Sequence, residues 1–166
     1  FTGSVSTAAS GGHPNLTLNV TRGDGQPSLR NFNLHLPTGL VANTAATTQC
    51  TQANATAANC AANQIVGTAS TTIGSGTETY ALSGSIYNVV PNANEPARLQ
   101  AIIPVNVGPF DLGNLSIPVG TSLRADYGVD ASAQLPLRYE GIAVRIQSLQ
   151  LVLAGTVSGQ NFMTNP

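Results

Sequence analysis

Lysine and tryptophan are both absent from this chain of 166 residues, and all six cationic side chains are arginines. Charged residues make up only 8% of the sequence, against about 25% in an average soluble domain. The lack of lysine excludes a lysine Schiff base and an isopeptide crosslink. A net charge of −1 provides no basic patch for nucleic acid or an anionic membrane. No apolar run approaches the roughly 18 residues of a membrane span, so membrane insertion is not expected either.

Apolar residues still make up 42% of the chain, so Thr, Ser, Asn, Gln and Gly replace the missing charges. This composition predicts a polar but nearly uncharged surface. Weak like-charge repulsion between copies of such a protein favours self-association. The sequence begins with Phe1 rather than methionine, which suggests that an export signal has been removed and that the protein is extracellular or on the cell surface.

The two cysteines, Cys50 and Cys60, enclose an alanine-rich segment. We predict a disulfide between them, since paired cysteines are typical of exported proteins. A metal site or a reactive thiol would need further ligands or a base, and the histidines His13 and His35 are not at ligand spacing. No metal, cofactor or free thiol is therefore expected. The enclosed segment is predicted to form a short helical turn capped by Thr51 or Asn54.

Period-two alternation of apolar residues dominates the rest of the chain and predicts about nine strands. A hairpin is expected from residues 16–20, a turn at 23–25 and a return strand at 32–36. Further strands are expected over 65–73, 78–90 with a break at Gly84, 98–107, 112–119, 123–129 and 137–153. Pro104 predicts an edge position or a bulge, and the change of phase at Gln147 and Ser148 predicts another bulge. We expect one all-β domain over residues 1–166, a β-sandwich of Ig-like or jelly-roll-like type, with residues 1–14 as an N-terminal arm or exchanged strand.

Several short motifs occur in an order that resembles a domain of large secreted actinobacterial cell-surface proteins. They are His13-Pro14-Asn15-Leu16, Leu36 to Asn43, the two cysteines, Ile65 to Thr68, Tyr87 to Pro91, Glu95 to Arg98, Asp126-Tyr127-Gly128 and Phe162 to Pro166. The resemblance spans most of the chain and implies an exported, cell-surface protein. It implies no catalytic residues.

No arrangement typical of an active site emerges. A Gly-x-Ser-x-Gly elbow is absent, and the histidines fall in a loop and on the polar face of a strand. The seven acids are better explained by turns and ion pairs, specifically Glu95 with Arg98, and Asp126 with Arg124 or Arg138. A calcium site at Asp126-x-x-x-Asp130 is the weaker alternative, because only two acids are local. We therefore expect no catalytic residues.

Four sequons mark candidate glycosylation sites at Asn15, Asn19, Asn54 and Asn114.

These features favour a non-enzymatic structural module that binds copies of itself or adjacent domains, as a filament or surface-layer subunit joined by strand addition. The apolar residues expected at the interface are Phe1, Val5, Val157 and Phe162. The alternative is an adhesion or carbohydrate-binding module that uses the loop between the cysteines and the acidic turns.

Overall fold

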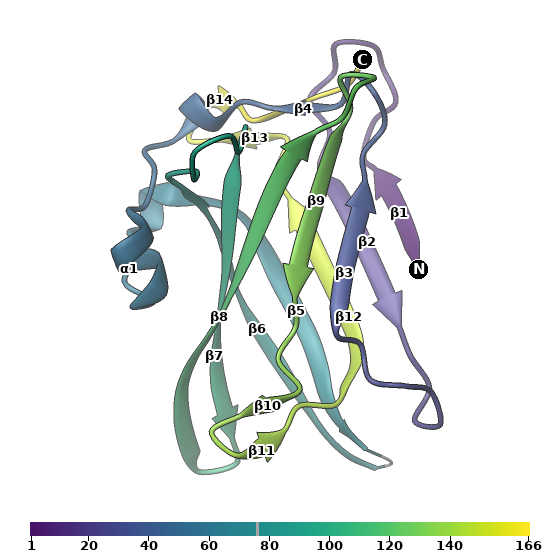
Figure 1. Cartoon of the computed structure of the whole chain (residues 1–166), viewed down its shortest axis with the longest axis vertical. Helices are drawn as coiled ribbons and strands as arrows, with labels where there is room; N and C mark the ends of the chain where they lie inside the picture. The colour runs from purple at the N-terminus through teal and green to yellow at the C-terminus, as the bar shows by residue number, and fades with distance from the viewer. Residues whose placement is uncertain (76) are drawn as a thin grey trace.

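The computed structural model describes residues 1–75 and 77–166, and its regular structure is mostly β-strand (Figure 1). The strands are β1 (Thr2–Val5), β2 (Leu16–Thr21), β3 (Asn31–His35), β4 (Val41–Ala42), β5 (Ile65–Ser75), β6 (Glu78–Val89), β7 (Arg98–Val107), β8 (Phe110–Leu123), β9 (Val129–Gln134), β10 (Arg138–Tyr139), β11 (Ile142–Ala143), β12 (Ile146–Leu153), β13 (Thr156–Val157), β14 (Gln160–Asn161) and β15 (Met163–Thr164). The helical elements are η1 (Thr44–Ala46), α1 (Gln52–Thr56) and η2 (Ala62–Gln64). The all-β prediction is confirmed.

Nine strands form one antiparallel sheet in the order β1-β2-β12-β5-β6-β7-β8-β9-β3. The finer prediction of a β-sandwich is not confirmed, because these strands form a single hydrogen-bonded sheet that curls until its two edges approach each other. The ring of Phe1, just before β1, lies 6.3 Å from the ring of Phe32 in β3, measured between centroids. The inner face of the curl surrounds the core.

The inner face carries the alternating apolar residues that the sequence pattern predicts. On β7, Ala101, Ile103 and Val105 are buried, and Leu99 and Val107 at its two ends are half-buried. They belong to one cluster of apolar side chains contributed by all the long strands. Because side chains alternate between the faces of a strand, the residues between them on β7 point to the outer face.

The local irregularities of the sheet match their sequence signals. The register between β7 and β8 shifts after Pro104, and the register between β12 and β5 shifts between Ile146 and Ser148. Both predicted bulges are therefore confirmed. β7 is nevertheless a central strand, so Pro104 is accommodated by the bulge and not by an edge position.

Four predictions about the strands are wrong. The expected strand over residues 137–153 is divided into β10, β11 and β12, because the chain reverses between β10 and β11, which pair as a hairpin. β2 and β3 do not form a hairpin, since β2 pairs with β1 and β12 while β3 pairs with β9. β6 continues through Gly84, where a Cβ would collide with the backbone carbonyl of Ile102 on β7. Residues 124–128 form a turn between β8 and β9 instead of a strand, with Tyr127 at a φ of 63°.

Short hairpins and segments cross both ends of the curled sheet. At the end that is uppermost in Figure 1, β4 pairs with β15, close to the C-terminus. At the opposite end, β10 and β11 form a small hairpin. In the described part of the chain, no helix has the length and apolar character needed to cross a membrane.

Candidate functional site

The N-terminal strand β1 forms one edge of the sheet. It pairs with β2 over four residues, from Thr2 opposite Asn19 to Val5 opposite Leu16, and every residue of β1 is exposed. Phe1 and Val5, two of the predicted interface residues, are 67% and 39% exposed. The predicted arm is therefore paired within its own chain, but its apolar side chains face solvent.

The other two predicted interface residues lie inside the molecule. Val157 and Phe162 belong to the main apolar cluster, and Phe162 is only 1% exposed. The tail that carries them is held by β4 and by the amide of Asn165, which donates to the carbonyl oxygens of Thr7 and Ala9. A partner would reach Val157 or Phe162 only if this tail left its own core, because the chain already uses both side chains for packing.

The predicted disulfide between Cys50 and Cys60 is present, with the Cα atoms 5.5 Å apart. It closes a loop around α1, and the Thr51 hydroxyl accepts a hydrogen bond from the Asn54 N–H, as expected for the cap. Cys50 packs with Ala55 and Val89 in a small cluster separate from the main core. The stapled loop thus covers the outer face of the sheet around β6.

Asn88 attaches the segment before the disulfide to the sheet. This fully buried amide donates hydrogen bonds to the carbonyl oxygen of Thr44, at 2.7 Å, and to the Thr47 hydroxyl, at 3.0 Å. Beside it, the N–H of Cys50 donates to the Asn88 carbonyl. Nothing in the alternation of β6 distinguishes Asn88 from the outward-facing polar residues, so sequence reasoning missed it.

The densest ionic cluster centres on Arg124, at the ends of β3, β8 and β9. Its guanidinium donates to both carboxylate oxygens of Asp126 and, at 2.6 Å, to Asp130. These bonds, with a further one from the Gly128 N–H, lower the pKa of Asp126 to about 2. The pKa of Asp130 is lowered as well, first by Arg124 and then by His35. The predicted pairing of Asp126 with Arg124 is confirmed, and the Arg124 guanidinium engages the carboxylates of both Asp126 and Asp130.

The second predicted ion pair, between Glu95 and Arg98, is also present at 2.8 Å. Burial would raise the pKa of Glu95, but hydrogen bonds from the Asn92 N–H and from Arg98 outweigh it and lower the pKa. No group of three or more His, Cys, Asp or Glu side chains that could hold a metal ion lies within residues 1–75 and 77–166. Among the acids of these residues, Glu95, Asp126 and Asp130 are held in ion pairs.

The remaining candidate residues are dispersed. His13 contacts the Met163 carbonyl through Nδ1, while His35 contacts Asp130 on another strand, so the two histidines do not share a site. Of the four sequon asparagines, Asn15, Asn54 and Asn114 are exposed and Asn19 is half-buried. Asn15 Oδ1 accepts a hydrogen bond from the Gly155 N–H, and Asn19 Oδ1 accepts one from Gln150.

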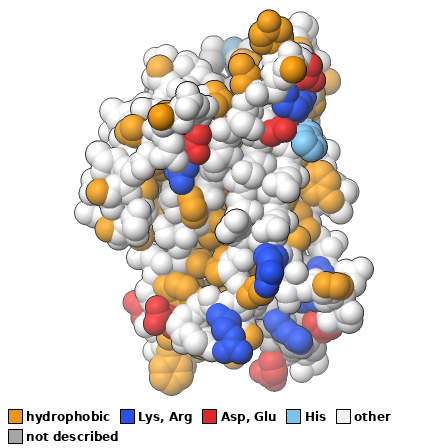
Figure 2. All heavy atoms as spheres, in the orientation of Figure 1, with side chains coloured by type: hydrophobic (Ala, Val, Ile, Leu, Met, Phe, Trp, Pro, Cys, Tyr) orange, Lys and Arg blue, Asp and Glu red, His pale blue; other side chains and the backbone are white. Residues whose placement is uncertain are grey.

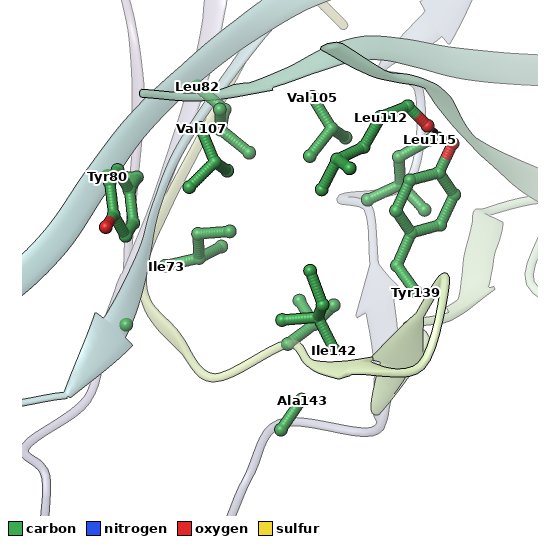
Figure 3. A pocket seen from close by; sticks show the side chains of 12 residues that line it. Ile73, Tyr80, Leu82, Val105, Val107, Leu112, Leu115, Tyr139, Ile142 and Ala143 are labelled. Atoms are coloured by element: carbon green, nitrogen blue, oxygen red, sulfur yellow. Dashed lines mark hydrogen bonds between the residues drawn. The ribbon is translucent and has the colours of Figure 1, made fainter. Parts of the chain in front are cut away.

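Two apolar cavities lie inside the curl, one near each end. Figure 3 shows the lower cavity, of about 170 Å³, in which side chains of Ile73, Val105, Leu112 and Ile142 surround a common space. The half-buried Tyr139 flanks it and donates a hydrogen bond to the Leu112 carbonyl. Burial, assisted by Glu140 and Asp111, raises the pKa of Tyr139.

The upper cavity is larger, about 280 Å³, and lies under β4 and β15. It is lined by the inward-facing residues of β2, β3, β7, β8, β9 and β12, together with Leu40, Phe162 and Met163 from the segments that cross this end. Neither cavity was anticipated from the sequence. The one available signal was the presence of alanine at inward positions, at 101 between Leu99 and Ile103 and at 131 next to Val129.

Comparisons with known proteins add no assignment: no family model, curated protein or solved structure matches this chain. The resemblance to secreted actinobacterial surface proteins therefore stays a prediction.

Proposed function

We propose that this protein is a non-enzymatic extracellular structural module that associates with copies of itself by exchanging its N-terminal strand. In the associated form, β1 of one copy pairs with β2 of the next. The disulfide is consistent with an oxidising compartment, which supports the extracellular location.

The observation that carries this proposal is the weak attachment of β1 to its own domain. β1 has four residues, all exposed, and a connection of ten residues, 6–15, leads to the strand with which it pairs. Two antiparallel neighbours are normally joined by two to five residues. Because β1 buries so little apolar surface in its own chain, its release costs less than the release of any inner strand.

Exchange preserves the local contacts that β1 makes. A second copy can supply the same four-residue register, from Thr2 opposite Asn19 to Val5 opposite Leu16. The exposed Phe1 and Val5 would then pack against the neighbouring copy. Since the donated strand and the accepting edge are different surfaces, the contact is head-to-tail and produces a filament wherever it does not close into a ring.

The surface composition also supports close packing of copies. In Figure 2, uncharged polar and backbone atoms dominate the visible face, and the charged side chains are few, with most of the basic ones toward the lower end. Two arginines of the described region, Arg98 and Arg124, form ion pairs with carboxylates of their own chain. Little like-charge repulsion therefore opposes contact between copies.

A cysteine pair tests the exchange directly. Ser4 and Thr17 are direct partners in the β1–β2 register, so the variant S4C/T17C would carry a crosslink exactly across the exchanged pair of strands. Exchange predicts covalent oligomers on a non-reducing gel after oxidation at the concentration at which the protein assembles. Refolding the same variant at high dilution should give crosslinked monomers that no longer assemble.

The matched control is S70C/S83C, which joins direct partners on β5 and β6 in the interior of the sheet. This pair should crosslink within one chain under every condition. Negative-stain electron microscopy of the wild type and of a variant lacking residues 1–12 completes the test, with filaments expected only for the wild type. Monomeric crosslinks in S4C/T17C, together with dispersed particles for the wild type at all concentrations, would refute the proposal.

A groove beside α1 favours carbohydrate binding as the second candidate function. It has a volume of about 450 Å³ and is lined in part by Gln52, Thr56, Arg98 and Asn114, whose amide, hydroxyl and guanidinium groups suit sugar hydroxyls. A monomer that binds a glycan array, and whose binding is weakened in N114A without a change in thermal stability, would favour this function over strand exchange.

A further inference from the structure

The upper cavity leaves inward-facing residues incompletely packed. Leu34, Leu99, Val119 and Leu151 all line it and are only half-buried, whereas Ile103, deeper on the same inner face as Leu99, is 1% exposed. Protein interiors normally contain few voids larger than a water molecule. A cavity of about 280 Å³ is therefore far larger than the voids that ordinary side-chain packing leaves, and it is a specific feature of this end of the fold.

Small residues create the space. Ala101 on β7 and Ala131 on β9 both line the cavity, Ala101 between the larger inward residues Leu99 and Ile103 and Ala131 next to Val129. Ala131 lies directly between Leu34 on β3 and Thr121 on β8 in the sheet register. A larger aliphatic side chain at either alanine would fill part of the cavity, which makes its volume adjustable by single substitutions.

The lining offers almost nothing to water. The Thr121 hydroxyl is already engaged with the backbone of Ala97, accepting from its N–H at 3.0 Å and donating to its carbonyl at 2.6 Å. The Thr44 carbonyl accepts from Asn88. A buried water needs two to four polar partners, and apolar cavities of about 150 Å³ are known to stay dry and to bind benzene or xenon. The interior thus suits an apolar molecule better than solvent.

The mouth of the cavity is marked by exposed apolar residues at the strand ends. Leu123 at the end of β8 and Val41 in β4 are 59% and 49% exposed, and both line the cavity. Next to Leu123 stands the Arg124 cluster, in which one guanidinium is shared by the carboxylates of Asp126 and Asp130. This rim has more negative than positive charge and no unengaged cation, so it disfavours a carboxylate or phosphate headgroup.

From these observations we infer that the upper cavity binds a single aliphatic chain of an uncharged amphiphile, with the chain inside the curl and its polar end at the rim. The volume sets the length. At about 30 Å³ for each methylene, close to the share of a water molecule, the cavity holds a chain on the order of ten carbons.

A series of straight-chain alcohols from hexanol to dodecanol tests this inference by displacement of a neutral fluorescent probe, N-phenyl-1-naphthylamine. Affinity should increase about fourfold for each added methylene and then level off at about ten carbons. Decanoate should bind at least about tenfold more weakly than decanol at pH 7, because Arg124, Asp126 and Asp130 together carry a net negative charge at the rim. Equal affinity for the two, or no binding of any alcohol up to its solubility limit, would overturn the inference.

Two variants locate the site. In A131L, the length at which affinity levels off should shorten by about three carbons, since the new side chain occupies that part of the cavity. The matched control is A81L, which places the same side chain on the exposed outer face of β6 and should leave the series unchanged. Thermal denaturation confirms that both variants fold. An unchanged profile in A131L, or the same shortening in A81L, would contradict binding in the upper cavity.

Discussion

Removal of the disulfide between Cys50 and Cys60 should destabilise the protein by a predictable amount while leaving the native fold intact. The two cysteines are separated by 10 positions, so the crosslink closes a loop of about eleven residues in the unfolded chain. In the chain-entropy model a loop of this size stabilises the folded state by about 2.8 kcal/mol. For a domain of this length, that corresponds to a decrease of roughly 6 to 12 °C in the melting temperature.

The native loop has other attachments that should keep it docked after reduction. The Ser116 hydroxyl donates to the Ala55 carbonyl, and the Gln52 amide donates to the carbonyl of Val90. The tyrosine bands in the near-ultraviolet circular dichroism of the reduced protein should therefore match those of the oxidised protein. Cys50 also packs in its small cluster, so C50A/C60A should lose about 1 kcal/mol more than the reduced wild type.

Urea denaturation of the oxidised protein, the reduced protein and C50A/C60A measures these quantities. A loss below about 1 kcal/mol on reduction would mean that the unfolded chain already restricts this loop, against the reasoning above. A loss above about 5 kcal/mol would mean that the loop organises the sheet and does not merely cover it.

Three further changes test other contacts. Asn88→Ala should lower the free energy of unfolding by about 2–3 kcal/mol in urea denaturation, because it removes two buried hydrogen bonds and leaves a carbonyl without its donor. The lowered pKa of Asp126 means that its pairing with Arg124 stabilises the fold above about pH 4 and that this contribution is lost as the pH falls toward 2; melting temperatures of Asp126→Asn should therefore depend less on pH in that window. Gly155→Ala should cost about 3 kcal/mol in the same urea assay, since a Cβ there collides with the backbone carbonyl of His13.

The sequence predicts the faces of the strands better than the partners of the strands. Alternation along residues 98–107 assigns the inner face of β7 correctly, and Pro104 marks its bulge, because both signals are local. Pairing depends on the curl of the whole sheet. The turn at residues 23–25 indicates a hairpin, yet the chain crosses there from β2 to the opposite edge, a choice that no local pattern encodes.

The same distinction applies to the candidate sites. The disulfide and the pairs Glu95–Arg98 and Arg124–Asp126 were predictable, because few cysteines and few charges leave few alternatives. The burial of Phe162 was not, since its apolar character suits an interface as well as a core. The upper cavity was missed for a related reason. A sequence shows which side chains face inward, but it does not show the distance between the strands that face each other across the interior.

The two proposals concern different parts of one curled sheet, an edge and the interior, and so are separable. Strand exchange requires only the β1–β2 edge, whereas the chain-binding cavity lies under β4 and β15 at one end. Two residues of β2, Leu16 and Leu18, nevertheless face that cavity while their backbone pairs with β1. A chain bound against them rigidifies the accepting strand and leaves its hydrogen-bonding edge open. With decanol present, S4C/T17C should therefore still form crosslinked oligomers. A switch from oligomers to monomers on adding decanol would show that the cavity and the edge compete for the same strand.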